Sequence, residues 1–254
     1  MLKIPEFLAT IQPMDHVTPI TAAQADTVTT LFNLGAHLGH KKNRLHPQAR
    51  KYLHSIINGI SVIDLSKTVQ QLDAACSYIT QLSSEGKHVL FVATKKASAP
   101  SIAKMCRENA IPAVTMKWIS GLLTNFDSIM KNVKHMNDMK DAQTKGDWDA
   151  FVKHERIKLQ KDLLRLEKWY GGLDQLHKRP DVLVVVDIRR EKNAVKEAQQ
   201  MHIPVVALVD TNANPDTIEY PIVSNDDSPE VIAYYMQEFV SAILAGRKEA
   251  ESKK

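Results

Sequence analysis

The residues with the clearest binding chemistry lie in a basic stretch near the start of the chain. Residues 27–63 contain no Asp or Glu, and residues 37–47 read HLGHKKNRLHP. Lys and Arg can neutralise phosphates, while His, Asn and backbone N–H groups on such a loop can donate hydrogen bonds to phosphate and ribose oxygens. The stretch therefore predicts a loop that binds a polyanion, and a merely solvated basic loop is the alternative.

The net charge of +4 is divided unevenly along the chain. Residues 27–107 hold eleven Lys and Arg against three acidic residues, whereas residues 191–254 hold six against eleven. An excess of positive charge on one part of a protein favours a polyanionic partner. We therefore expect the first part of the chain, and not the last quarter, to face a polyanion.

Carboxylates at the ends of predicted strands suggest a second kind of chemistry, phosphoryl transfer or metal binding. Asp64, Asp187 and Asp210 hold such positions. The sequence has neither GxGxxG after a strand nor GxxxxGK[ST], and it lacks the GxSxG motif of a nucleophilic serine. We therefore expect these residues to form helix caps and turns. An α/β enzyme that acts on a phosphorylated metabolite through Asp187 and Asp210 is the alternative.

Four histidines and two cysteines are the candidate zinc ligands. Zinc sites usually need thiolates or four well-spaced ligands, and the neighbouring cations would repel a dication. The cysteines are about thirty residues apart and lie on apolar helical stripes, so they are expected to be small buried hydrophobic residues. The residues considered are His37, His40, His46, His54, Cys76 and Cys106, and we predict no metal or cofactor.

The hydrophobic pattern predicts the scaffold that must position these residues. Buried strands are expected at residues 60–64, 88–93, 112–116, 182–186 and 205–209, with helices between them, among others at 98–109 and 190–200. Residues 227–229 are expected to cap a final helix. Continuous apolar strands that alternate with helices predict a parallel α/β sheet covered on both faces.

The pattern changes between residues 126 and 170. Two apolar seams at helical spacing consist of Phe126, Ile129, Val133 and Met136, and of Val152, Leu159, Leu163, Leu166 and Tyr170. The sequence Lys-Gly-Asp at 145–147 separates them, so we expect two antiparallel helices joined by a short loop and packed as a coiled coil. An arm of about 18 residues would reach roughly 27 Å from the sheet. An ordinary surface hairpin is the alternative.

The length of 254 residues allows one domain with a large insertion, or two domains. The expected divisions are an N-terminal extension (1–26), a first α/β part (27–125), the hairpin (126–170), a second α/β part (171–246) and a charged tail (247–254). The extension is expected to end at Asp26, which would cap a helix through Val28 and Leu31.

With 44% hydrophobic and 24% charged residues, the composition excludes a disordered or collagen-like chain. No apolar run approaches the roughly 18 residues that cross a bilayer, so no membrane partner is expected. Residues 1–26 resemble neither a secretory signal nor a transit peptide.

A series of short blocks runs through the chain in a distinctive order. The blocks are LGAHLGH (34–40), NGI (58–60), IDL (63–65), KT (67–68), FVATKK (91–96), KW (117–118), GLLTNF (121–126), GG (171–172), PD (180–181), VVD (185–187), AVKEA (194–198), IPVVALVDTN (203–212) and NDD (225–227). In this order, over roughly residues 30–245, they resemble the bacterial-type small-subunit ribosomal protein 2 family.

The resemblance implies a flavodoxin-like, doubly wound parallel sheet with an inserted coiled-coil hairpin, and a structural role in the small ribosomal subunit without enzymatic activity. The implied partners are small-subunit rRNA and neighbouring ribosomal proteins, and no homo-oligomer is expected. We expect the protein neighbours to contact the hairpin and the acidic last quarter. The expected rRNA-binding residues are His37, His40, Lys41, Lys42, Asn43, Arg44, Arg50, Lys51, Lys95, Lys96, Lys104, Lys117 and Trp118.

The chain departs from the usual bacterial pattern in its basic stretch. Leu38 stands where Phe is usual, Leu45 and His46 replace Trp-Asn, and Ile57 replaces Arg. These changes remove stacking and charge that such a loop can supply to RNA. They favour an organellar ribosome, most of all a mitochondrial one, with the bacterial cytoplasm or a plastid as alternatives.

Overall fold

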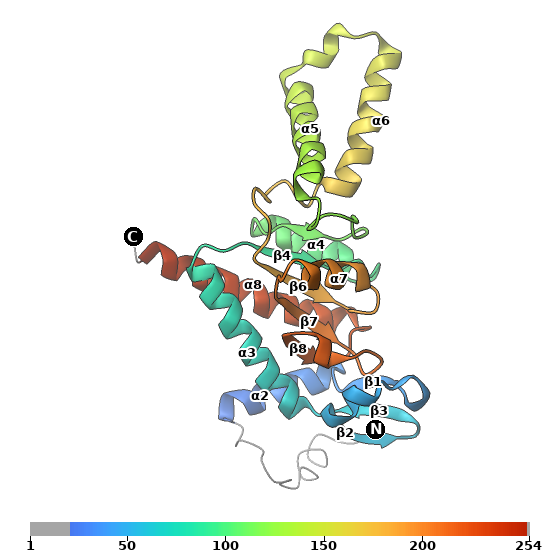
Figure 1. Ribbon diagram of the computed structural model, residues 1–254, viewed down its shortest axis with the longest axis vertical. Helices are drawn as coiled ribbons and strands as arrows, with labels where there is room; N and C mark the ends of the chain where they lie inside the picture. The colour runs from blue at the N-terminus through green and yellow to red at the C-terminus, as the bar shows by residue number, and fades with distance from the viewer. Residues whose placement is uncertain (1–20, 253–254) are drawn as a thin grey trace.

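The computed structural model describes residues 21–252, and its centre is a five-stranded parallel sheet (Figure 1). Its order is β5-β4-β6-β7-β8, with bounds β4 Val89–Val92, β5 Ala113–Val114, β6 Val182–Val186, β7 Val205–Val209 and β8 Tyr220–Val223. Every residue of β4, β6 and β7 is buried, as their apolar runs predict. The apolar pattern does not predict β8, and β5 is shorter than the expected strand.

Helices cover both faces of this sheet. In β6, Val182, Val184 and Val186 face one core, and Leu183 and Val185 face the other, because successive strand residues point to opposite sides. The first core contains residues of α2 Ala22–Leu34, α3 Leu65–Ser84, α4 Ala99–Glu108 and α8 Pro229–Ser252. The second contains residues of α7 Lys192–Gln200 and of the hairpin. The predicted doubly wound, flavodoxin-like α/β fold is therefore confirmed.

The two predicted helix caps have different outcomes. Helix α2 begins at Ala22, where the Thr21 hydroxyl accepts a hydrogen bond from the Gln24 N–H and the Gln24 side chain accepts one from the Thr21 N–H. The prediction that Asp26 caps this helix is wrong, because this capping box begins the helix earlier. At α8, Pro229 is the first residue and the Ser228 hydroxyl accepts a hydrogen bond from the Val231 N–H, as predicted.

A second, antiparallel sheet carries the basic stretch. Its order is β1-β3-β2, with bounds β1 Leu38–Lys41, β2 Leu53–Ile57 and β3 Ile60–Ile63. Asn58 and Gly59 join β2 to β3 with φ of 51° and 77°, the left-handed conformation of a tight hairpin turn. The strand expected at 60–64 thus exists but belongs to this sheet and not to the parallel one. We call β1–β3 with the connecting residues 42–52 the small sheet.

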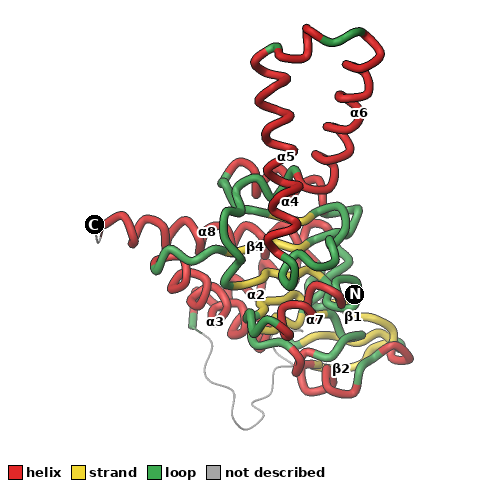
Figure 2. Tube along the Cα trace, turned by 45° about the horizontal axis from the view of Figure 1, so that its top comes forward, coloured by secondary structure: helices red, strands yellow, loops and turns green. Residues whose placement is uncertain are grey.

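The hairpin projects as an arm beyond the edge of the parallel sheet that β5 and β4 form (Figures 1 and 2). It consists of α5 Phe126–Lys145, a 3-10 turn Asp147–Ala150 and α6 Lys153–Tyr170, so the predicted helical hairpin is confirmed. Val133, Met136 and Leu163 are buried between the helices. Val152 does not belong to this seam, because it precedes α6 and is 56% exposed. In the described part of the chain, no helix combines the length and the apolarity needed to cross a membrane.

Candidate nucleic-acid interface

The small sheet presents a group of cations to solvent. Lys41 ends β1, Lys42 and Arg44 lie in the 3-10 turn Lys42–Arg44, and Arg50 lies in the next turn, Pro47–Tyr52; all four are exposed, as is Asn43. Among residues 21–252, none of these four cations has a carboxylate within ion-pair distance. Their charge is therefore available to an external anion. We call these four residues the cationic edge.

The turn that carries the cationic edge is held by backbone contacts. The Lys42 N–H donates to the Gly59 carbonyl at 2.8 Å, and the His46 N–H donates to the Thr211 carbonyl at 2.8 Å. Gly39 makes the close approach to the parallel sheet possible, because a Cβ there would lie 2.6 Å from the Thr211 side chain. The cations therefore extend from a fixed backbone, which lowers the entropy lost on binding.

Arg189, which is not among the predicted rRNA-binding residues, joins this group. It is exposed on the loop after β6 and lines one shallow depression with Asn43, Arg44 and Asn212. The small sheet lies against the carboxyl edge of the parallel sheet, so the loop after β6 is brought next to it. The doublet Arg189-Arg190 after a predicted strand is the signal that could have found it.

Lys51 is exposed but already paired. Its Nζ lies 2.6 Å from the Asp216 carboxylate, and the hydrogen bond to Asp216 raises the pKa of Lys51. An RNA phosphate at Lys51 would have to compete with this carboxylate. Lys51 therefore differs from the cationic edge, although both come from the same basic stretch.

The two predicted histidines of the stretch face inward. His37 stacks on Phe32 with ring centroids 4.3 Å apart, and burial lowers its pKa. His40 places Nδ1 2.8 Å from the Asp210 carboxylate and Nε2 3.0 Å from the Asn212 side-chain amide. Both rings are half-buried. The hydrogen bonds of His40 attach the small sheet to the loop after β7.

Lys95 lies in a cluster of carboxylates at the ends of the parallel strands. Its Nζ is 3.2 Å from Asp187, 2.6 Å from Asp226 and 2.9 Å from Asp227, and the side chain is only 14% exposed. Burial alone would lower the pKa of Lys95, but the three carboxylates raise it above its ordinary value. Lys95 therefore neutralises carboxylates of its own chain. Its position in a Lys-Lys doublet suggests a solvent-facing lysine instead.

The surrounding carboxylates are held by the chain as well. The Asp187 side chain accepts the N–H groups of Arg189 and Arg190, each at 3.0 Å, and Asp64 caps α3 by accepting the Ser66 N–H at 3.1 Å. The Asp210 carboxylate accepts the Thr211 hydroxyl at 2.9 Å. The predicted cap and turn roles of Asp64 and Asp187 are thus confirmed, and Asp210 contributes to a comparable local turn.

One group in this cluster could hold a divalent cation. His40, Asp210 and Asp227 each offer a ligand atom, and these atoms lie within 4.8 Å of one another. Of the four histidines considered for zinc, only His40 enters the group. Lys95, which contacts Asp227, adds a positive charge that opposes a cation there.

The cysteines have the character that their helical stripes predict. Cys106 is buried and Cys76 is half-buried, and burial raises the pKa of each thiol to about 12. Both are therefore protonated at neutral pH and poor nucleophiles or ligands.

The remaining predicted residues lie outside the small sheet. Lys96, Lys104 and Lys117 are exposed, and Figures 1 and 2 show α4, which carries Lys104, near the base of the arm and away from the small sheet. Trp118 is only 6% exposed, and its indole N–H donates to Glu197 at 2.9 Å. The structure thus makes Trp118 a packing residue, because no open ring face remains for a base.

The protein belongs to a class of α/β scaffolds defined by three features. These are a doubly wound parallel sheet, a basic antiparallel sheet at its carboxyl edge, and a helical-hairpin arm. The order of the sequence motifs identifies one family within this class. The family described as Ribosomal protein S2 matches residues 31–246, and the chain belongs to this family. The family is one of ribosomal proteins and is not a class of enzymes.

Bacterial proteins described as small ribosomal subunit protein uS2 are similar over most of their length. The protein of Dehalococcoides mccartyi is 41% identical over 85% of this chain and 89% of its own. The corresponding values are 39%, 85% and 79% for Gloeobacter violaceus, and 34%, 87% and 90% for Helicobacter acinonychis. The predicted family resemblance is therefore confirmed.

Proposed function

We propose that the chain is a structural constituent of the small ribosomal subunit that binds rRNA through the cationic edge. The observation that carries this proposal is that Lys41, Lys42, Arg44 and Arg50 face solvent without carboxylate partners among residues 21–252. Such unpaired cations on a fixed backbone suit phosphates. Family membership and the names of the relatives support the ribosomal assignment.

Arg189 and Asn43 extend the proposed surface beyond the four cations. Both line the depression beside Arg44, where an amide and a guanidinium could contact phosphate or ribose oxygens. His37, His40 and Lys95 support this surface from within, because their side chains contact Phe32, Asp210 and the strand-end carboxylates. Lys51, Lys96, Lys104 and Lys117 would add contacts outside it.

The salt dependence of rRNA binding tests this function. Six phosphate contacts would lower the affinity about a thousandfold between 50 and 200 mM salt, because each contact releases condensed counterions. The measurement is a titration of the full chain with its cognate small-subunit rRNA fragment at several salt concentrations. A flat affinity across this range would contradict the proposal.

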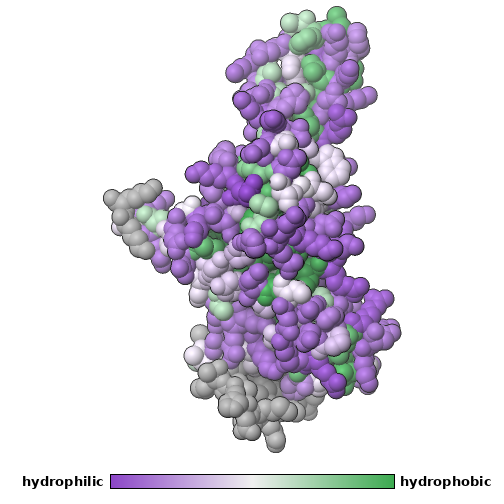
Figure 3. All heavy atoms as spheres, viewed as in Figure 1, coloured by the Kyte–Doolittle hydropathy of each residue, from purple (hydrophilic) through white to green (hydrophobic). Residues whose placement is uncertain are grey.

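We further propose that the arm and the acidic C-terminal part contact neighbouring ribosomal proteins, with α5 and α6 packed as a coiled coil. Exposed apolar side chains of the arm support protein contacts: Phe151 is 46% exposed and Ile157 47%. Figure 3 shows further hydrophobic groups at the end of the arm and also on the small sheet. Cross-linking in assembled subunits should join arm lysines to other proteins. Cross-links to rRNA alone would contradict this assignment.

The compartment of the ribosome has two main alternatives. The departures at Leu38, Leu45 and Ile57 favour a mitochondrial ribosome, whereas the relatives named above are bacterial and favour the bacterial cytoplasm. The genome that carries the coding gene decides between them.

We also infer that the strand-end carboxylates are structural and not catalytic. Their support is the set of contacts within the chain: Asp187 with Lys95 and two backbone N–H groups, and Asp210 with His40 and Thr211. A thermal-shift screen with nucleotides and divalent metals tests this inference. Stabilisation by a nucleotide that is lost in Asp187→Ala would favour the enzyme alternative.

A further inference from the structure

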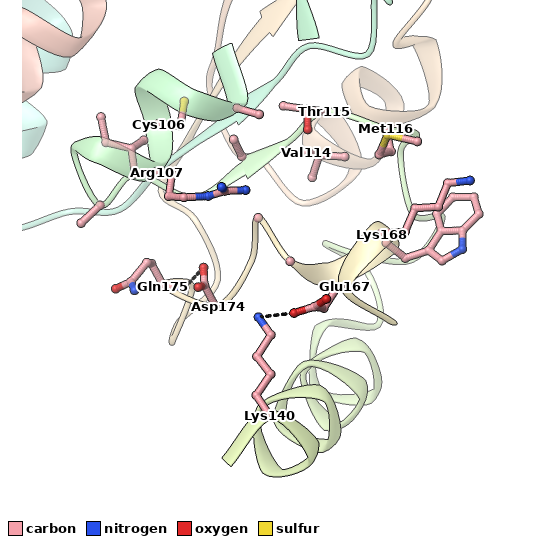
Figure 4. A pocket seen from close by; sticks show the side chains of 17 residues that line it. Cys106, Arg107, Val114, Thr115, Met116, Lys140, Glu167, Lys168, Asp174 and Gln175 are labelled. Atoms are coloured by element: carbon pink, nitrogen blue, oxygen red, sulfur yellow. Dashed lines mark hydrogen bonds and ion pairs between the residues drawn. The ribbon is translucent and has the colours of Figure 1, made fainter. Parts of the chain in front are cut away.

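A cleft of about 580 Å³ lies between the parallel sheet and the base of the arm. Helix α4 contributes Arg107, the chain after β5 contributes Met116, and α6 contributes Lys168 and Trp169. Figure 4 shows Met116 and Lys168 at one end of the cleft and Arg107 with Asp174 at the other. The volume is within the range of sites that bind small ligands.

Trp169 differs from the other two tryptophans of the chain. Its side chain is 41% exposed, whereas Trp118 and Trp148 are 6% and 8% exposed and belong to the core of the second face. Met116, also exposed, lines the same cleft. An aromatic ring and a thioether at the wall of a cleft offer a surface on which a planar apolar group can pack.

The charges around this cleft favour an anion. Arg107 and Lys168 are exposed, and in the described part of the chain neither has a carboxylate within ion-pair distance. Of the two acids that line the cleft, Glu167 pairs with Lys140 at 3.4 Å. The Asp174 carboxylate accepts the Gln175 N–H at 3.0 Å and keeps its negative charge. Arg107, Lys140 and Lys168 thus outweigh the two carboxylates by one charge, so the lining keeps a net positive charge.

We infer that this cleft binds a short single-stranded segment of RNA, with one base stacked on Trp169 and backbone phosphates near Lys168 and Arg107. This inference rests on the proposed function and adds a second RNA site, remote from the cationic edge. Stacking on aromatic rings combined with nearby cations is the usual way in which proteins bind single strands. A protein anchored on Trp169 would instead have to bring a carboxylate to each of Arg107 and Lys168, because burying an unpaired charge is costly, whereas a single RNA strand carries a phosphate at every nucleotide.

Tryptophan fluorescence of the full chain tests the site, since Trp118 and Trp148 are shielded and Trp169 is not. The titrant is an oligouridylate of about eight nucleotides, and the protein carries K41A, K42A and R44A so that the cationic edge contributes little. We expect quenching that disappears in Trp169→Phe. Trp169→Ala lacks this fluorescent reporter, so its affinity is measured by filter binding of the same oligouridylate; it should bind about 5- to 150-fold more weakly, the range for one stacked base.

Two controls separate stacking from charge and from unfolding. Leu164→Ala changes an exposed residue of α6 that does not line the cleft, and it should leave the affinity unchanged. Heparin carries negative charge without bases and should not quench Trp169. Equal affinity in Trp169→Ala, or equal quenching by heparin, would overturn the inference, as would burial of Trp169 by a protein in assembled subunits. The proposed function would survive each of these results, because it depends on the cationic edge.

Discussion

Two Lys-Lys doublets of this chain have opposite environments. Lys41 and Lys42 in the small sheet both face solvent without acidic partners in the described range. Lys95, by contrast, is surrounded by Asp187, Asp226 and Asp227, and only its neighbour Lys96 is exposed. The same dipeptide is thus open to an external anion in one region, whereas in the other its first lysine pairs with carboxylates of the chain.

The difference arises from where the chain places carboxylates. The ends of parallel strands meet at one edge of the sheet, and there the loops after β6 and β8 bring three Asp side chains to the loop after β4. The cationic edge lies on a separate sheet whose own sequence, residues 38–63, contains no acid. A lysine is therefore available to RNA only where the fold brings no carboxylate to it.

Removing the exposed charges should have the largest effect on RNA binding. The triple variant K41A/K42A/R44A takes away three cations that we expect to bind phosphates. Its affinity for the rRNA fragment should fall about 500-fold at 0.1 M salt, and the slope of log affinity against log salt should decrease by about 2.7. Stability should change little, because the side chains are exposed. Filter-binding titrations at several salt concentrations measure both the affinity and the slope.

The matched control replaces exposed cations on the arm, Lys131 and Lys134, by Ala. This variant removes a similar kind of charge from outside the cationic edge and should keep most of the affinity. An equal loss in both variants would mean that net charge, and not the small sheet, determines binding.

Replacing Lys95 should act on stability instead. In Lys95→Ala three carboxylates lose their common partner, and breaking such a largely buried pair lowers the free energy of unfolding by about 3 kcal/mol. Lys96→Ala, one residue away, should stay within about 0.5 kcal/mol of the parent chain. Urea denaturation followed by circular dichroism measures both. Similar stabilities of the two variants would remove the contrast between the doublets.

The scaffold was predictable from sequence to the extent that local pattern determines it. The runs at 182–186 and 205–209 are strands with those same bounds, because fully buried parallel strands are continuously apolar. Strand β8 escapes this rule, since Tyr220 and Pro221 at its start are half-buried. The Asn58-Gly59 turn was visible, but the sheet to which β3 belongs depends on pairing with β1 across the basic stretch.

The interface was less predictable, because its chemistry depends on residues distant in sequence. The exposed group Lys41 to Arg44 follows from composition, whereas the pairing of Lys95 requires Asp226, and the burial of Trp118 requires Glu197. Arg189 reaches the interface only through the return of the chain after β6. Long-range placement decided each of these cases. Only Arg189 has a local signal, the Arg189-Arg190 doublet after a predicted strand.

The pH dependence of stability shows whether Asp226, beside Lys95, keeps its proton in the folded chain. Burial, together with the charge of Asp187, raises the pKa of Asp226 from 3.8 to about 7. Between pH 3.8 and about 7, the Asp226 carboxyl is therefore ionised in the unfolded chain but still protonated in the folded chain. The free energy of unfolding should therefore fall as the pH rises through this window, by at most about 1.4 kcal/mol per pH unit.

Asp226→Asn isolates this contribution, because an amide does not ionise. Its urea midpoint should depend less on pH between 4 and 7 than that of the parent chain, with EDTA present in both samples to remove bound metal. An unchanged pH dependence would show that Asp226 is already ionised beside Lys95 throughout the range.

The smallest expected effect on RNA affinity comes from a substitution that frees a paired lysine of the small sheet. Lys51 pairs with Asp216 at 2.6 Å, and both side chains are exposed. Asp216→Asn removes the competing carboxylate and should raise the affinity for the rRNA fragment by about fivefold at physiological salt, the gain from one additional phosphate contact. The double variant Lys51→Ala/Asp216→Asn should lose this gain. If Asp216→Asn instead weakens binding, the pair itself positions the small sheet, and the availability of a lysine is not determined by its carboxylate neighbours alone.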